Sequence, residues 1–95
     1  MQADSVRAVV TGGVSGLGLA VARRIVADGG KVALLDVNDA RGAEAIALLG
    51  AANSCYLHTD VTDEADVASS VAAAHDVLGG LNAAISCAGI LGAGR

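Results

Sequence analysis

Short apolar segments alternate along this sequence with segments of helical periodicity, and this alternation is the strongest constraint on the fold. The apolar segments have the length of buried strands, and glycines or polar residues bound them. A helix between two strands is typical of a right-handed crossover between parallel strands. The sequence therefore predicts an α/β fold with the order β-α-β-α-β-α-β around a parallel sheet. The predicted strands cover residues 6–10, 31–36, 54–58 and 81–86, and the predicted helices cover 16–28, 40–49 and 63–78.

Glycines and a hydroxyl side chain mark the predicted helix ends. Gly29–Gly30 follow the first helix, Gly50 follows the second and Gly79–Gly80 follow the third, where a left-handed residue is often needed. Thr62 is the predicted N-cap of the third helix, ahead of an acidic first turn. The predicted buried stripe of this helix is Val67, Val71, Ala74 and Leu78.

The charge balance argues against nucleic acid as a partner. Six basic residues against ten acidic ones give a formal net charge of −4. Arg23–Arg24 is the longest basic run, and we interpret it as a solvated helix face. The uncharged run 77–94 contains too many glycines for a membrane helix, and the first residues lack the pattern of a signal peptide. We expect no membrane partner.

The cysteines and histidines indicate neither disulfides nor a metal site. Cys55 and Cys87 are too few for a disulfide framework and do not form a Cys-x-x-Cys pair. His58 and His75 have no partner at metal-ligand spacing. We therefore expect a reduced, cytoplasmic protein without a metal ion.

The segment Thr11–Gly18, between the first predicted strand and helix, reads TGGVSGLG. Gly12 stands at the turn out of the strand, where a positive φ is expected. Gly16 leaves backbone amides at the helix start open to a diphosphate. Gly18 falls on the predicted sheet-facing side of the helix, where a missing side chain permits close packing. That side also contains Leu17, Val21, Ala22, Ile25 and Val26.

A P-loop and a tight turn without a ligand are the two alternatives to a dinucleotide loop in this segment. A triphosphate-binding P-loop needs Lys and Ser or Thr after its last glycine, but Leu19 and Ala20 follow Gly18. A tight turn without a ligand stays open on local evidence. No basic residue lies between Thr11 and Ala22, so phosphate binding would depend on backbone amides and the helix dipole.

Acidic side chains follow the second and third predicted strands. Asp36 ends the second strand, where a carboxylate can accept hydrogen bonds from ribose hydroxyls and repel a 2′-phosphate, which favours NAD over NADP. Arg41 is expected on the following helix, pointing outward. Asp60 and Val61 follow the third strand and are candidates for the adenine end of the same cleft. Capping roles for Asp36 and Asp60 stay open alternatives.

The fourth predicted strand ends in Ser86-Cys87-Ala88-Gly89, where small residues allow a ribose to lie against the backbone. No general base at a recognisable position supports Cys87 as a nucleophile. Together with the glycine loop, Asp36 and the Asp60-Val61 pair, this segment resembles the short-chain dehydrogenase/reductase family. The resemblance implies a Rossmann-type doubly wound sheet and a small-molecule substrate. The implied NAD contacts are Gly12, Ser15, Gly16, Leu17, Gly18, Asp36, Asp60, Val61, Cys87 and Gly89.

Within the family, residues 9–18 and 87–90 look most like the type-2 3-hydroxyacyl-CoA dehydrogenase branch. This resemblance implies oxidation of 3-hydroxyacyl-CoA thioesters, or of hydroxysteroids, by a full-length homo-oligomer. Ser86 departs from the family's usual Asn, which helps to hold the central strand. The family's catalytic Tyr-x-x-x-Lys pair is missing, since the single Tyr56 is followed four residues later by Asp60 and the single lysine is Lys31.

The missing pair leads us to interpret residues 1–95 as one incomplete domain, the NAD-binding part of a dehydrogenase that is inactive by itself. A sheet that stopped at Arg95 would leave an apolar strand edge unpaired, which natural proteins avoid. The alternative is a stand-alone NAD-binding or regulatory module without catalysis.

Overall fold

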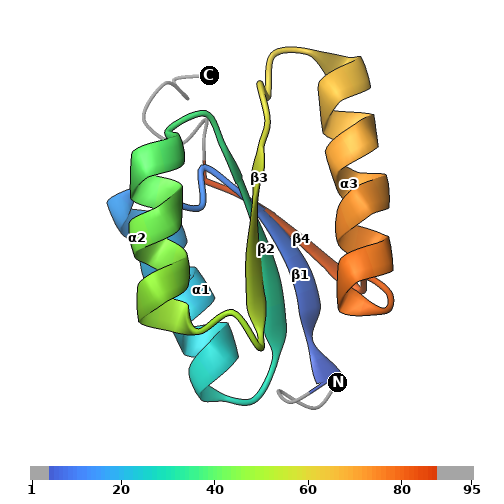
Figure 1. Ribbon diagram of the computed structural model, residues 1–95. Helices are drawn as coiled ribbons and strands as arrows, with labels where there is room; N and C mark the ends of the chain where they lie inside the picture. The colour runs from blue at the N-terminus through green and yellow to red at the C-terminus, as the bar shows by residue number, and fades with distance from the viewer. Residues whose placement is uncertain (1–4, 88–95) are drawn as a thin grey trace.

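The computed structural model describes residues 5–87 and contains a sheet between two layers of helices (Figure 1). Strands and helices alternate along the chain as the sequence predicts. The elements are β1 (Arg7–Thr11), α1 (Gly16–Ala27), β2 (Lys31–Asp36), α2 (Asp39–Leu49), β3 (Ser54–His58), α3 (Glu64–Leu78) and β4 (Ala83–Ser86).

The four strands form one parallel sheet in the order β3-β2-β1-β4. Val9 of β1 is paired with Ala33 on one side and with Ala84 on the other, so β1 is a central strand. Helices α1 and α2 cover one face of the sheet and α3 covers the other (Figure 1). This confirms the predicted doubly wound α/β fold.

Successive side chains along each strand point to opposite faces of the sheet and fill two separate apolar layers. Val10 and Leu34 lie in the layer beneath α1 and α2, and Leu35 lies in the layer beneath α3. Because β1 and β2 are buried on both faces, their sequences are almost continuously apolar, as is typical of parallel sheets. Alanines at the helix positions facing the sheet, such as Ala22 and Ala74, allow a close approach of helix and sheet.

The helix starts differ from the prediction in their capping residues. Asp63, not Thr62, caps α3, because its Oδ1 accepts from the amides of Ala65 and Asp66 at 3.0 and 3.2 Å. The Thr62 hydroxyl instead donates to Asp60. Asn38 caps α2, which therefore begins at Asp39 rather than at residue 40.

Other element ends differ by one or two residues. β1 begins at Arg7 and ends at Thr11, and α1 ends at Ala27. β4 begins at Ala83 rather than at residue 81, and Asn82 precedes it. The Asn82 side chain accepts from the amide of Arg7 at 2.8 Å, which anchors the entry to β4 beside the entry to β1.

The buried faces of two helices also differ from the prediction. Leu17, which the prediction places against the sheet, is 52% exposed because it lies at the open end of α1. The buried residues of α3 include Ser70, which is not part of the predicted apolar stripe. Its hydroxyl lies 2.7 Å from Oγ1 of the buried Thr59, so the two polar groups satisfy each other.

The first turn of α1 packs directly on the glycine loop that precedes it. A Cβ atom at Gly18 would overlap the carbonyl oxygen of Gly12 and lie 2.9 Å from Cα of Gly13. The Ser15 hydroxyl donates to the Gly12 carbonyl oxygen at 2.6 Å and accepts from the Gly18 amide at 3.2 Å. The predicted close approach at Gly18 is thus present, but its partner is the loop backbone rather than β1.

Replacing Gly18 with alanine should destabilise the protein, because rigid backbone atoms occupy the space that the methyl group needs. We expect the free energy of unfolding to fall by about 2 kcal/mol, although alanine favours helix by up to about 1 kcal/mol. Chemical denaturation measures this loss. Gly16→Ala is the matched control, since a Cβ there meets nothing within 4 Å. Equal stability of the two variants would contradict the packing described here.

Candidate functional site

A cavity of about 530 Å³ lies at the edge of the sheet where the parallel strands end. Its size is within the range of small-molecule sites. Residues from the loops after all four strands contribute to it, because the carboxyl ends of parallel strands meet at one edge. The lining residues are Gly12, Ser15, Leu17, Leu35, Asp36, Val37, Thr59, Asp60, Val61, Thr62 and Cys87.

The position of the cavity follows from the strand order. The connection from β1 leads through α1 to β2, whereas β4 lies on the opposite side of β1. Loops therefore diverge at the carboxyl end of β1, and ligands of doubly wound folds bind at such a switch point.

The glycine loop forms the wall of the cavity beside β1. Gly12 has a φ of +68°, as the sequence predicts, and its amide donates to the Leu35 carbonyl oxygen at 2.9 Å. Ser15 caps α1, and the first turn of that helix contains no acidic residue. A Cβ atom at Gly16 would have no neighbour within 4 Å, so the space beside this residue is open. The positive end of the α1 dipole therefore faces an accessible region that suits an anion.

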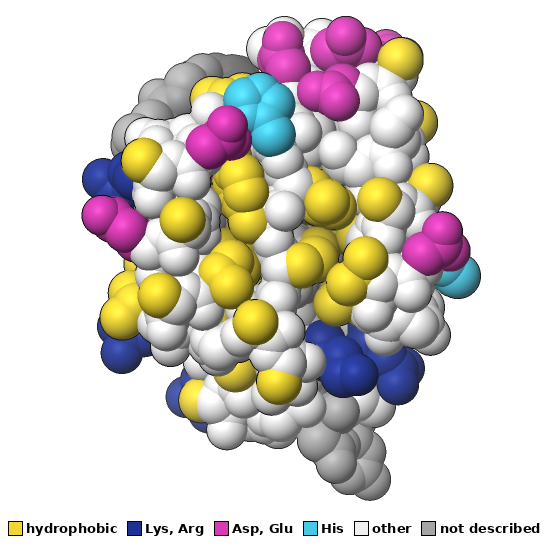
Figure 2. All heavy atoms as spheres, in the orientation of Figure 1, with side chains coloured by type: hydrophobic (Ala, Val, Ile, Leu, Met, Phe, Trp, Pro, Cys, Tyr) yellow, Lys and Arg dark blue, Asp and Glu magenta, His cyan; other side chains and the backbone are white. Residues whose placement is uncertain are grey.

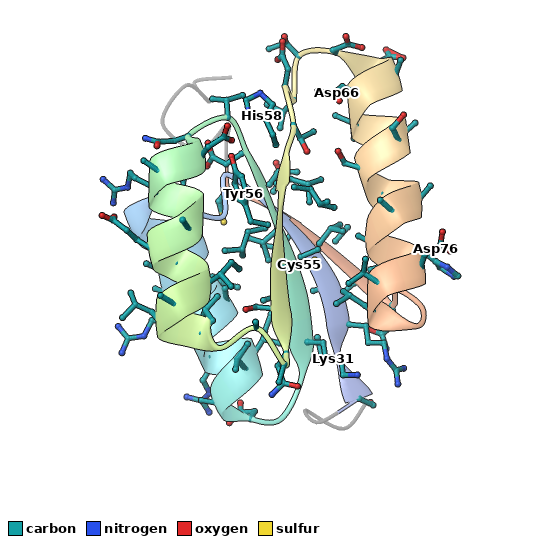
Figure 3. All side chains as sticks on the ribbon, viewed as in Figure 1. Lys31, Cys55, Tyr56, His58, Asp66 and Asp76 are labelled. Carbon is teal, nitrogen blue, oxygen red and sulfur yellow. The ribbon has the colours of Figure 1, made fainter. Side chains whose placement is uncertain are left out.

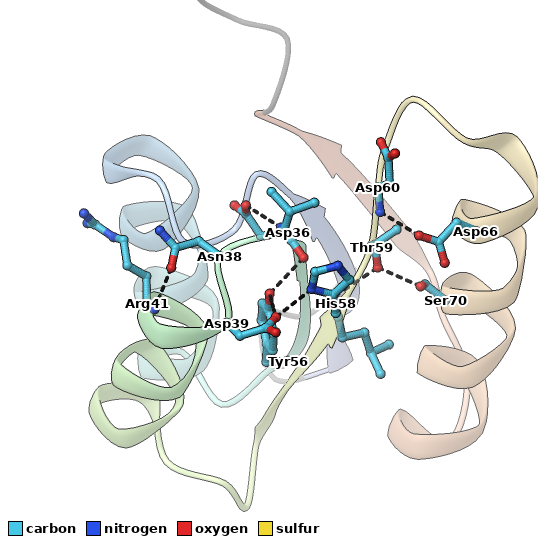
Figure 4. Close-up of polar contacts among 12 residues, drawn as sticks. Asp36, Asn38, Asp39, Arg41, Tyr56, His58, Thr59, Asp60, Asp66 and Ser70 are labelled. Carbon is cyan, nitrogen blue, oxygen red and sulfur yellow. Dashed lines mark hydrogen bonds and ion pairs between the residues drawn. The ribbon is translucent and has the colours of Figure 1, made fainter.

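Asp36 lies at the end of β2 beside this loop, where the sequence placed it. One carboxylate oxygen accepts from the amide of Val37 at 2.7 Å, and the other is 3.4 Å from the amide of Val14. The second contact is long, so that oxygen retains capacity for another donor. Arg41 lies on α2 and is exposed, with its guanidinium directed away from Asp36 as expected (Figure 4).

Asp60 and Val61 line the side of the cavity next to β3, as expected. The Asp60 carboxylate accepts from the hydroxyl and the amide of Thr62 at 2.6 and 2.9 Å. These hydrogen bonds lower the pKa of Asp60, so the group is an ionised acceptor near neutral pH. The amide of Asp60 donates to Asp66 of α3 at 2.7 Å, which fixes the loop.

Cys87 is buried and lines the cavity next to β4, and its amide donates to the Thr11 carbonyl oxygen at 2.9 Å. Gly89, another predicted contact, lies outside the described residues. Thr59 is a lining residue that the sequence analysis missed. Its side chain is fully buried and bonded to the Leu57 carbonyl oxygen and to Ser70, and no local sequence signal distinguishes it from a loop threonine.

Tyr56 and Lys31 do not form a catalytic pair. Tyr56 is the middle residue of β3 and is in register with Leu34, whereas Lys31 lies at the amino end of β2 (Figure 3). Within residues 5–87, no group of three His, Cys, Asp or Glu side chains could hold a metal ion. In the same part of the chain, no helix has both the length and the apolar character needed to cross a membrane.

Comparison with known proteins agrees with this geometry. A family model described as short chain dehydrogenase matches residues 6–95. Momilactone A synthase of Oryza sativa subsp. japonica is 44% identical over 85 residues, which cover 90% of this chain and 31% of the relative. Human 3-hydroxyacyl-CoA dehydrogenase type-2 is 44% identical over 84 residues, with coverages of 87% and 31%. The chain thus spans about a third of the length of these relatives.

Solved structures agree in fold and include nucleotide complexes. A short-chain dehydrogenase/reductase from Burkholderia phymatum in complex with NAD has a TM-score of 0.82 at 31% identity, covering 88% of this chain and 31% of that one. A 3-ketoacyl-(acyl-carrier-protein) reductase from Brucella melitensis, complexed with NADH, has a TM-score of 0.80 at 29% identity, with coverages of 86% and 34%. This chain belongs to the short-chain dehydrogenases, a family of oxidoreductases that bind NAD or NADP.

Proposed function

We propose that this chain is the NAD-binding part of a short-chain dehydrogenase that interconverts a hydroxyl and a carbonyl group on a small molecule. One observation carries the proposal: the carboxylate of Asp36 and the open N-terminus of α1 line the same cavity. A carboxylate and a helix N-terminus are the two groups that a ribose and a diphosphate need side by side.

The diphosphate of NAD would bind at the glycine loop. Ser15 and Leu17 line the cavity at the first turn of α1, and the open space in front of Gly16 gives phosphate oxygens access to backbone amides. Gly12 turns the chain out of β1 with its positive φ, and Gly18 lets α1 start directly on the loop. The loop would therefore bind through amides and the helix dipole rather than through a basic side chain.

The adenosine half would lie against the loops after β2 and β3. Asp36 has free acceptor capacity for ribose hydroxyls, and Asp60 is an ionised acceptor for the adenine amino group. Val61 is 40% exposed and offers an apolar surface to the adenine ring. At the other end, Cys87 and Gly89 would lie near the second ribose.

The charge around the adenosine half favours NAD over NADP. Acidic side chains gather at the end of the molecule where β3 gives way to α3 (Figure 2). A 2′-phosphate next to Asp36 would meet like charge at short range. The guanidinium of Arg41 is too exposed and too far turned outward to compensate for that repulsion (Figure 4).

The substrate class follows from the relatives and is part of the proposal. Bound NAD supplies a hydride acceptor, and the residues described here would bind and orient it. 3-Hydroxyacyl-CoA thioesters are supported as substrates by the 44% identity to human 3-hydroxyacyl-CoA dehydrogenase type-2. A 3-beta-hydroxysteroid dehydrogenase of Comamonas testosteroni is also 44% identical, so hydroxysteroids are the second substrate class. We propose a cytoplasmic homo-oligomer in which residues 1–95 contribute part of a single domain.

A non-catalytic NAD-binding module is the second candidate. It is favoured by the absence of a Tyr-x-x-x-Lys pair from this sequence, since Tyr56 is the middle residue of β3 and the single lysine, Lys31, begins β2 (Figure 3). The two candidates differ in whether the full-length protein that contains this chain reduces NAD when it is given a hydroxyl substrate.

Asp36→Ala should weaken NAD binding and relax the rejection of NADP. Hydrogen bonds to a charged group contribute about 1.5–3 kcal/mol, so we expect the Kd for NAD to rise at least tenfold. The Kd for NADP should change less or fall. Isothermal titration calorimetry with both nucleotides measures the two constants.

Asp76→Ala is the matched control, because Asp76 is an exposed aspartate near the far end of α3 (Figure 3). It should leave both constants unchanged. Equal affinity of the unmutated protein for NAD and NADP would contradict the role proposed for Asp36. Absence of NAD binding would contradict the proposed function itself.

A further inference from the structure

A hydrogen-bonded cluster of three side chains adjoins the cavity without lining it. Tyr56 is the sole aromatic residue of the sequence, and Asp39 and His58 are its polar neighbours. The three residues come from β3 and from the start of α2, and they converge beside the last residue of β2 (Figure 4). We call them the tyrosine cluster.

The contacts of the cluster are short and directed at one turn. The phenol of Tyr56 is 2.9 Å from the carbonyl oxygen of Asp36 and 2.7 Å from Oδ1 of Asp39. Nδ1 of His58 is 2.7 Å from the same Asp39 oxygen. Both ends of the four-residue turn 36–39 therefore lie within hydrogen-bond distance of one phenol, whose single proton the two acceptor oxygens share.

Packing on α2 fixes the position of the phenol. Gly42 is buried, and a Cβ atom there would lie 2.6–2.7 Å from three atoms of the Tyr56 ring. Because Gly42 has no side chain, the Tyr56 ring can pack directly against α2. Burial raises the pKa of the Tyr56 phenol, and the nearby Asp39 carboxylate raises it further, so the group remains a donor at physiological pH.

The turn that the phenol holds also forms part of the cavity. Asp36 and Val37 line the cavity, and the Asp36 carboxylate accepts from the Val37 amide at 2.7 Å. The Asp36 carbonyl oxygen accepts from the Thr59 amide at 2.8 Å as well as from Tyr56. The ladder bond to Thr59 aligns the end of β2, and the phenol ties that end to the first residue of α2.

We propose that Tyr56, supported by Asp39 and His58, is a positioning residue that sets the orientation of Asp36 toward the adenosine ribose of the cofactor. This inference rests on the proposed NAD site. Tyr56 acts through the backbone of residues 36–39 and does not contact the nucleotide. Loss of the phenol hydroxyl would leave the Asp36 carboxylate in place. It would make the backbone of residues 36–39, which orients that carboxylate, more mobile.

Tyr56→Phe keeps the ring on Gly42 and removes the hydrogen bonds of the phenol. We expect the Kd for NAD to rise about fivefold, which is the ordinary effect of losing one hydrogen bond. The ratio of the Kd for NADP to that for NAD should fall by about the same factor, because a misaligned carboxylate discriminates less. Calorimetric titrations of the purified protein with both nucleotides give this ratio.

Ser54→Ala is the matched control. The Ser54 hydroxyl also donates to a backbone carbonyl oxygen, that of Gly50 at 2.7 Å, but Ser54 is the first residue of β3 and lies at its amino end. In Ser54→Ala the ratio of the Kd for NADP to that for NAD should equal the ratio in the unmutated protein, even if the melting temperature of the variant is lower. An unchanged ratio in Tyr56→Phe, or an equal fall in Ser54→Ala, overturns the positioning role. Unmutated protein that does not bind NAD overturns the proposed function and this inference with it.

The cluster also predicts the titration of His58. The hydrogen bond to Asp39 raises the pKa of His58 above the usual histidine value of 6.5, and the charges of Asp39, Asp66 and Asp60 act in the same direction. The stabilisation from protonated His58 is complete below about pH 6.5 and is lost as pH rises through the higher pKa of the folded protein.

An NMR titration of the His58 ring should give a pKa above 6.5, and Asp39→Asn should lower it. The free energy of unfolding of the unmutated protein should decline over the same pH interval. An identical His58 pKa in both proteins would show that Asp39 does not hold the imidazole, and it would overturn the supporting role given to this pair.

Discussion

The parallel arrangement of all four strands is the constraint on which the rest of this structure depends. Each crossover through a helix returns the chain to the same edge of the sheet, so every β-to-α loop ends beside the others. This brings Gly12, Asp36, Asp60 and Cys87, which are far apart in the sequence, to one cavity. An antiparallel pairing at any step would move one of these loops to the opposite edge and divide the site.

The electrostatics of that edge combine two opposite signs at short range. The N-terminus of α1 provides a positive helix end without a basic side chain, and the loops after β2 and β3 provide the carboxylates Asp36 and Asp60. A dinucleotide has a complementary arrangement of groups, with anionic phosphates between ribose and base groups that donate hydrogen bonds. This complementarity supports NAD as the proposed ligand more strongly than the size of the cavity does.

The sequence predicted the features that depend on local physics. Gly12 with its positive φ, Gly18 at a close contact and Asp36 at a strand end follow from strand and helix periodicity together with glycine's lack of a side chain. Features that depend on tertiary partners were missed or misplaced. Asp63 replaces Thr62 as the cap because Thr62 donates to Asp60. Tyr56 meets Asp39 only once α2 has packed on β3, so periodicity could not reveal the cluster.

The most direct test of the proposed cofactor site is an amide-resolved NMR titration of the protein with NAD. We expect the largest shifts at the carboxyl edge of the sheet and small shifts at the amino edge, in the turns 28–30, 50–53 and 79–82. The amides expected to shift most are those of Gly12, Ser15, Leu17, Val37 and Val61. Largest shifts at the amino edge, or no saturable shifts at all, would contradict the account.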